Sequence, residues 1–135
     1  MESPVPARIL VVDDEEHERK LLEDLAREEG YLTLSATNGK EALALAVTEQ
    51  PNLILLDLVM PDMDGFEVTR WLKHNPATRA IPVILATALE DVAAHERMLS
   101  CGADEFINKP VDRWELSLRI SKLLKSYRSA AASVA

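Results

Sequence analysis

Polar residues with the makings of a reactive site follow four short apolar runs of this chain. They are Asp13 and Asp14 after the first run, Asp57 after the second, Thr87 after the third, and Lys109 with Pro110 after the fourth. Packing does not call for a carboxylate at the end of a buried strand, because a charge is costly to bury unless it is paired. Three acids, a hydroxyl and an ammonium in one cleft would suit a divalent cation and a phosphoryl group.

The elements that would position these residues alternate along the chain. Buried strands are predicted at residues 8–12, 53–56, 81–86 and 105–108, with a half-exposed edge strand at 31–36. Helices are predicted at residues 15–29, 40–49, 66–74, 91–101 and 113–127. Apolar strands that alternate with helices predict a parallel sheet covered on both faces. In doubly wound sheets ligands bind beyond the carboxyl ends of the strands, which is where these polar residues would converge.

Composition bounds the class of protein. The 135 residues suit one domain, and a hydrophobic content of 47% argues against disorder. A net charge of −8 disfavours nucleic acid or an anionic membrane as a direct partner. Residues 1–6 lack the basic start and apolar stretch of a signal peptide, and no run is long enough to span a membrane.

The single cysteine, Cys101, excludes an internal disulfide and a thiolate zinc site. It precedes Gly102 at an apolar helix end, so we expect a buried thiol, which fits a reducing, cytoplasmic compartment. We expect residues 1–7 to be a lead, residues 8–127 the folded domain, and residues 128–135 a tail or the start of a linker. This tail consists mostly of small residues and contains no residue that would cap and end the preceding helix.

Four motifs, in this order and spacing, resemble the receiver domain of two-component response regulators. They are Leu10–Glu15, Leu55–Gly65, Pro82–Ala88 and Gly102–Pro110, and they cover most of the chain. The resemblance implies an α/β, flavodoxin-like, doubly wound sheet of five parallel strands in the order 2-1-3-4-5, with five helices. It also implies that a sensor histidine kinase or a phosphotransfer protein gives a phosphoryl group to Asp57.

The resemblance assigns roles to the strand-end residues. Mg²⁺ or Mn²⁺ would be held by Asp13 and Asp14, directly or through water, by Asp57, and by the backbone carbonyl of Val59. Asp57 would be both ligand and nucleophile. Lys109 would pair with Asp57 at rest and with a phosphoryl oxygen afterwards, and Pro110 would follow a cis bond.

The same resemblance implies a conformational switch. The hydroxyl of Thr87 would move toward the phosphoryl group, and Phe106, which lacks the phenol of many relatives, would rotate into the space left behind. The output surface would comprise the helix at 91–101, the strand at 105–108 and the helix at 113–127. Asp104 and Arg119 match positions that pair across a homodimer in DNA-binding relatives, although Ser121 stands where those relatives often carry a basic residue. A dimer is therefore a hypothesis.

Other conspicuous residues have simpler interpretations. The histidines His17, His74 and His95 are expected to be solvated, because none has the spacing of a zinc motif. The two tryptophans, Trp71 and Trp114, are expected in the core or in helix-face packing. The first helix is expected to bury Leu21, Leu22, Leu25 and Ala26 on one face. Gly65 is expected to supply an unusual backbone angle in a loop.

Two rival functions stay open on the sequence alone. A Mg²⁺-dependent phosphohydrolase with an aspartyl nucleophile would usually carry a second aspartate where this chain has Val59. A binding module that never takes phosphate would usually have lost part of the acidic pair, the nucleophile or the lysine. Because Val59 and Leu89 are apolar and cannot orient an attacking water, we expect slow self-dephosphorylation of a switch, not a turnover enzyme.

Overall fold

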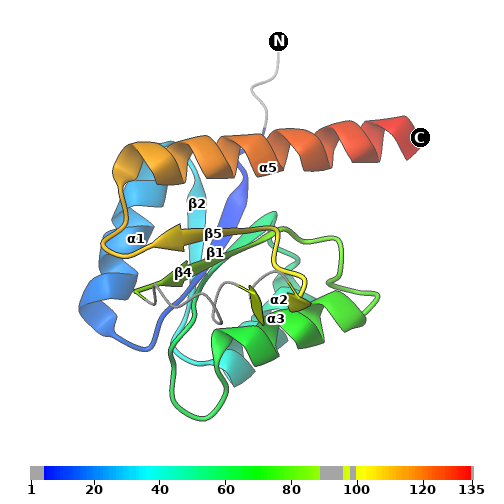
Figure 1. Ribbon diagram of the computed structural model, residues 1–135. Coiled ribbons are helices and arrows are strands. Elements are labelled where there is room, and N and C mark those ends of the chain that lie inside the picture. The colour runs from blue at the N-terminus through cyan, green and yellow to red at the C-terminus, as the bar shows by residue number, and fades with distance from the viewer. Residues whose placement is uncertain (1–4, 89–95, 98–99, 135) are drawn as a thin grey trace.

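The computed structural model describes residues 5–88, 96–97 and 100–134 of the chain (Figure 1). Its sheet contains the strands β1 (Arg8–Val12), β2 (Leu32–Ala36), β3 (Leu53–Asp57), β4 (Val83–Thr87) and β5 (Glu105–Asn108). All neighbouring strands are parallel, and their order is β2-β1-β3-β4-β5. The predicted doubly wound topology is confirmed. The chain places β2 on one side of β1 and then β3, β4 and β5 on the other side, so the topological switch point lies between β1 and β3.

The described residues form four helices: α1 (Glu16–Glu28), α2 (Gly39–Glu49), α3 (Gly65–His74) and α5 (Arg113–Val134). Side chains before the first three helices accept hydrogen bonds from the free backbone N–H groups of the first turn. Glu15 has this role for α1, so that helix begins one residue later than predicted. The fourth predicted helix, at 91–101, falls largely outside the described residues.

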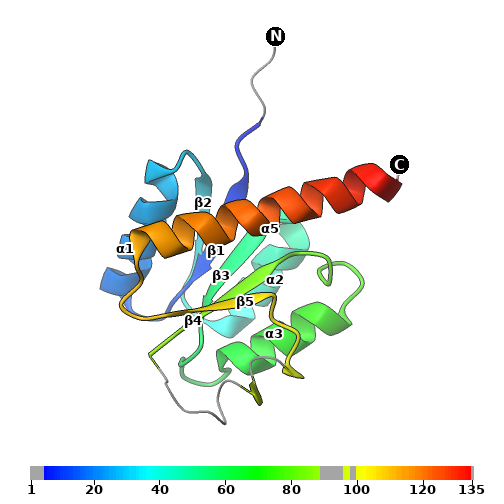
Figure 2. The same ribbon diagram turned by 45° about the horizontal axis from the view of Figure 1, so that its top comes forward.

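The C-terminal helix is longer than the sequence pattern predicted. We expected it to end near Tyr127, but α5 continues to Val134. The alanines at 130–132 explain the difference, because alanine has the highest intrinsic helix propensity and these residues contain no glycine or proline to end the helix. Figure 2 shows α5 as one unbroken helix lying in front of the sheet.

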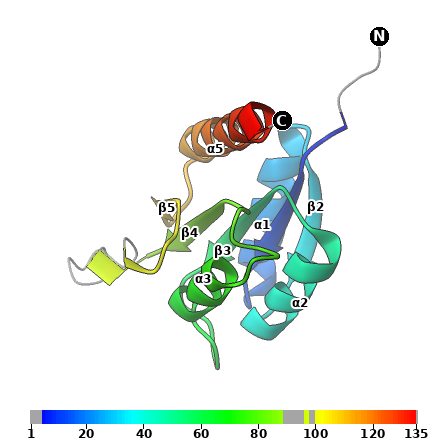
Figure 3. The same ribbon diagram turned by 90° about the vertical axis from the view of Figure 1, so that its right-hand side faces the viewer.

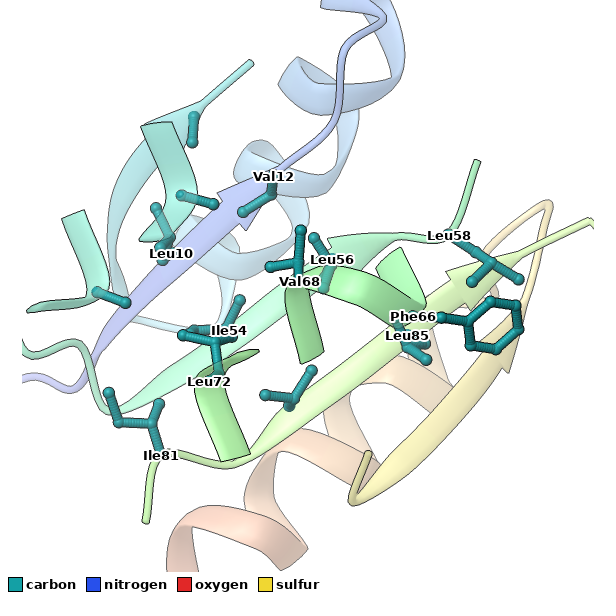
Figure 4. Close-up of a cluster of buried hydrophobic side chains, with 14 of the residues drawn as sticks. Leu10, Val12, Ile54, Leu56, Leu58, Phe66, Val68, Leu72, Ile81 and Leu85 are labelled. Atoms are coloured by element: carbon teal, nitrogen blue, oxygen red, sulfur yellow. The ribbon is translucent and has the colours of Figure 1, made fainter. Parts of the chain in front are cut away.

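The sheet is covered on both sides, as its apolar strands require. Alternate strand residues face α2 and α3 on one side and α1 and α5 on the other, and both arrays are buried (Figure 3). Figure 4 shows the first of these cores, where Val68 and Leu72 of α3 pack against strand residues such as Ile54 and Leu56. The internal strands β3 and β4 are buried along their whole length.

Several side chains lie differently from the sequence expectation. Leu21 of α1 is 52% exposed, although Leu22 and Ala26 are buried as predicted. Trp71 and Trp114 are 41% and 77% exposed, so neither belongs to the core. In α3 and α5 the buried stripe is already filled by other apolar residues, which leaves the two tryptophan rings on the outer face.

The remaining expectations about isolated residues can be compared directly. Cys101 is buried, as predicted, and burial raises the pKa of its thiol. His17 and His74 are exposed, whereas His95 lies outside the described residues. Among the described helices, none has the length and apolar character needed to cross a membrane.

Candidate functional site

Three carboxylates meet at the carboxyl ends of the two central neighbouring strands β1 and β3. Asp13 directly follows β1 and Asp57 is the last residue of β3, while Val12 and Leu56 are register partners. Asp13, Asp14 and Asp57 each offer an oxygen, and these oxygens lie within 4.8 Å of one another. Asp13 and Asp57 are buried and Asp14 is exposed. Figure 1 shows that the arrowheads of β4 and β5 also point to the side where α1 begins.

The turn after β1 is fixed by its own hydrogen bonds. The Oδ1 atom of Asp13 accepts from the backbone N–H of Glu15 at 3.0 Å, which is an aspartate turn immediately before the helix. The guanidinium of Arg19, one turn into α1, donates to the Asp13 carbonyl at 3.0 Å. Asp13 is therefore held by both its side chain and its backbone carbonyl.

Lys109, which directly follows the edge strand β5, brings a positive charge to the acids. Its Nζ atom donates to Asp57 at 2.8 Å and to Asp13 at 3.1 Å. The backbone N–H of Lys109 donates to the Thr87 carbonyl at 2.8 Å, and the bond to Pro110 is cis. The β5 end is thus tied to the β4 end, and the lysine side chain reaches across to the acids.

A fourth carboxylate at this site was missed by the sequence analysis. Glu18 of α1 accepts from Lys109 Nζ at 2.7 Å, the shortest of the three ammonium contacts. The signal available was its place in the first turn after the acidic pair. That signal does not show which way the helix presents the side chain.

Burial and the lysine set the protonation of the site. Burial is the main cause that raises the pKa of Asp57 to about 6, and the hydrogen bond from Lys109 opposes it. Burial likewise raises the pKa of Asp13, against the hydrogen bond from the Glu15 N–H and the charge of Lys109. Burial lowers the pKa of Lys109, but its hydrogen bonds to Asp57 and Glu18 outweigh this and raise it, so the ammonium stays charged.

The loop after Asp57 returns closely to the strand it left. The backbone N–H of Gly65 donates to the Leu58 carbonyl at 2.8 Å. A Cβ on Gly65 would lie 2.8 Å from both the Asp57 carbonyl oxygen and the Leu58 Cα. The expectation of an unusual backbone angle was wrong, because Gly65 begins α3 without a positive φ. This residue is glycine because the backbone approaches too closely for a side chain.

The other predicted site residues take distinct positions. Thr87 is the buried last residue of β4, the strand whose Ala86 is the register partner of Asp57. Phe106 of β5 is partly buried and packs against the core on the α3 side, the side that Thr87 also faces by alternation with Leu85. Val59 lies two residues past Asp57 with its side chain exposed, while Leu89 lies outside the described residues.

The residues suggested for a dimer contact are engaged within the chain. Asp104 accepts from Lys73 Nζ at 2.9 Å and from the Val83 backbone N–H at 2.7 Å. Arg119 pairs with Glu105 at 2.8 Å and with Glu115 at 3.0 Å. These contacts stabilise the single chain as it stands.

The donor set suits a small hard cation. Carboxylate oxygens are the ligands that Mg²⁺ prefers, and three of them converge here from two elements. A single ammonium balances only part of their charge, so a divalent ion would offset the remaining repulsion and the cost of burying Asp57. The residues present therefore fit a Mg²⁺ site.

Fold and site together define a class of protein. A flavodoxin-like sheet with an acidic, lysine-bridged pocket at its switch point is the architecture of receiver domains. Residues 9–121 match the family model described as the response regulator receiver domain, and the chain belongs to this family. Receiver domains are phosphoacceptor signalling switches rather than classical turnover enzymes, bind Mg²⁺ in an acidic pocket, and act with histidine kinases or phosphotransfer proteins as partners.

Named relatives and solved structures agree with this assignment. The response regulator PleD of Caulobacter vibrioides is 46% identical over 119 residues, which cover 88% of this chain but 26% of PleD. The polar-differentiation response regulator DivK of Brucella anthropi is 39% identical over 91% of this chain and 97% of its own length. This chain thus spans about a quarter of one relative and nearly all of another.

Solved structures also match this chain over most of its length. The receiver domain of a signal transduction histidine kinase from Syntrophus aciditrophicus has a TM-score of 0.84 and 41% identity, covering 89% of this chain and 91% of its own. The receiver domain of the sensor histidine kinase PA1611 from Pseudomonas aeruginosa has a TM-score of 0.83 and 26% identity, covering 90% and 99%. That structure is described with a magnesium ion coordinated in the active-site cleft.

Proposed function

We propose that Asp57 accepts a phosphoryl group from the phosphohistidine of a sensor histidine kinase or a phosphotransfer protein. The observation that carries the proposal is the contact of one ammonium, Lys109, with both Asp57 and Asp13 in a pocket of three convergent carboxylates. A phosphoacceptor needs a nucleophile, a cation site beside it and a fixed positive group, and the pocket offers a candidate for each of the three.

The chemistry follows from these contacts. A bond from an Asp57 carboxylate oxygen to phosphorus forms as the phosphorus–nitrogen bond of the phosphohistidine breaks, and the departing imidazole keeps the electron pair. Lys109 shifts from Asp57 to a phosphoryl oxygen, and the Thr87 hydroxyl donates to another. Asp13, Asp14, Asp57 and the Val59 carbonyl would hold Mg²⁺, which offsets the negative charge of nucleophile and transferred group.

The output side of the proposal concerns the far edge of the sheet. Thr87 and Phe106 face the same side of β4 and β5, so movement of the threonine toward a phosphoryl group would open space for the ring. The surface of β5, α5 and the segment 91–101 would then change and control an output domain or a partner protein. We place this activity in the cytoplasm, where kinase and phosphotransfer partners are available.

Homodimerisation through that surface is part of the proposal and has its own test. Arg119 would have to leave Glu105, and Asp104 would have to leave Lys73, before they could pair across two chains. Light scattering after treatment with beryllofluoride, a stable phosphoryl mimic, should show a doubled mass. A monomer throughout would remove the dimer from the proposal.

Intact mass spectrometry tests the central claim. Wild type treated with acetyl phosphate and Mg²⁺ should gain the mass of one phosphoryl group, and Asp57→Asn should gain none. Asp64→Asn is a matched control, because Asp64 is a nearby acid whose side chain caps α3. Equal labelling of wild type and Asp57→Asn would contradict the proposal, and continuous phosphate release from small phosphoesters would favour the phosphohydrolase instead.

A further inference from the structure

Glu18 accepts one of the three hydrogen bonds that the ammonium of Lys109 can donate. An ammonium has three N–H donors, and those of Lys109 are directed to Asp13, Asp57 and Glu18. Asp13 and Asp57 belong to the acidic pocket itself. Glu18 is not part of the convergent carboxylate group, and it approaches the lysine from α1.

The contact is close but open to water. Glu18 lies 2.7 Å from Lys109 Nζ, and its side chain is 47% exposed against 9% for Asp57. The hydrogen bond from Lys109 is the main cause that lowers the pKa of Glu18, so the carboxylate stays ionised at neutral pH. A half-exposed ion pair is weak and can open, unlike a buried one.

We propose that Glu18 is a positioning residue that restrains Lys109 and slows phosphorylation of Asp57. This inference rests on the proposed function and deepens it. A phosphoryl group that arrives at Asp57 must gain a hydrogen bond from Lys109, and Glu18 competes for the same ammonium. The lysine reaches the phosphoryl oxygen most readily when it is released from α1.

Substitutions at Glu18 and at a control residue separate the effect of the contact with Lys109 from the effect of the charge. Glu18→Ala removes both the carboxylate and the contact. Glu18→Asp keeps the charge on a side chain one methylene shorter, which no longer reaches the lysine. Glu16→Ala is the matched control, since Glu16 is an exposed acid in the same helical turn, and the described ion pairs of Lys109 include Glu18 but not Glu16.

The assay is the rate of phosphoryl gain from acetyl phosphate with Mg²⁺, followed by intact mass. Glu18→Ala and Glu18→Asp should both react about two- to fivefold faster than wild type, the size expected for a partly exposed ion pair. Glu18→Gln, which still reaches Lys109 as a neutral acceptor, should fall between them and wild type. Glu16→Ala should match wild type, and thermal unfolding should confirm that all variants are folded.

Each other result overturns the inference. Equal acceleration in Glu18→Ala and Glu16→Ala, with none in Glu18→Asp, would show that general charge repulsion controls the rate. Identical rates in all proteins would show that Glu18 does not restrain the lysine. If wild type itself gained no phosphoryl group, the proposed function would fail, which is a separate and recognisable outcome.

Discussion

Replacement of Asp57 by asparagine should stabilise the metal-free protein at neutral pH. Asp57 is buried, and its pKa is raised from 3.8 to about 6, chiefly by burial. The ionised carboxylate is therefore less favourable in the folded chain than in the unfolded chain. At about 1.4 kcal/mol per pH unit this difference corresponds to about 3 kcal/mol, an order-of-magnitude value. Asparagine has the same shape without the charge, and Lys109 keeps its contacts with Asp13 and Glu18.

The sign of the pH dependence follows from proton linkage. Between pH 4 and pH 6 the folded protein binds more protons at Asp57 than the unfolded protein does, so stability falls as the pH rises through this window. The loss is complete only well above pH 6, where Asp57 is ionised in the folded protein as well. The advantage of Asp57→Asn should therefore be small near pH 4 and should reach its full value, up to about 3 kcal/mol, by pH 7.5.

Urea unfolding followed by far-ultraviolet circular dichroism, in EDTA from pH 4 to pH 8, measures this difference. Asp64→Asn serves as the control, since Asp64 lies outside the acidic pocket and its loss should not stabilise the protein. A variant that is less stable than wild type at pH 7.5, or a stability difference that does not change with pH, would refute the reasoning.

Further outcomes can be measured in the same way. Gly65→Ala should lose about 1–3 kcal/mol and take phosphoryl groups poorly, because its Cβ would press on the Asp57 backbone. Gly30→Ala, strained by a φ of 92° but with no atom within 4 Å, should lose stability and keep its labelling rate. Mg²⁺ should raise the unfolding temperature of wild type more than that of Asp13→Asn, and EDTA should reverse the effect. The phosphoryl group should persist for minutes or longer and should be lost faster in Val59→Asn; a lifetime of seconds in wild type would contradict the expectation.

The sequence could predict the topology and the strand-end acids because both follow from local patterns. Apolar runs mark strands, and the residue after each run lies at the carboxyl edge, so Asp13, Asp57 and Thr87 were placed by counting alone. Lys109 is 52 residues from Asp57, yet the same edge rule brings the two together.

Features that depend on helix rotation or on backbone approach could not be predicted in this way. Glu18 meets Lys109 across 91 residues, through the orientation of α1 against the β5 end. Gly65 shows no sign in the sequence of how closely α3 returns to β3. Trp114 is exposed because Leu116, Ile120 and Leu124 form the face of α5 that packs on the sheet. The residue type of Trp114 alone does not show on which face of the helix it lies.

The three contacts of Lys109 have a consequence for how the chain becomes reactive. They join Lys109, which directly follows β5, to residues 96, 91 and 52 positions earlier in the sequence, so none can form until this last strand has docked. Before that point the acids lie without their counter-charge, and Asp57 is a poor nucleophile for an anionic donor. We therefore expect that a nascent or partly unfolded chain, in which β5 has not yet docked, takes up no phosphoryl group.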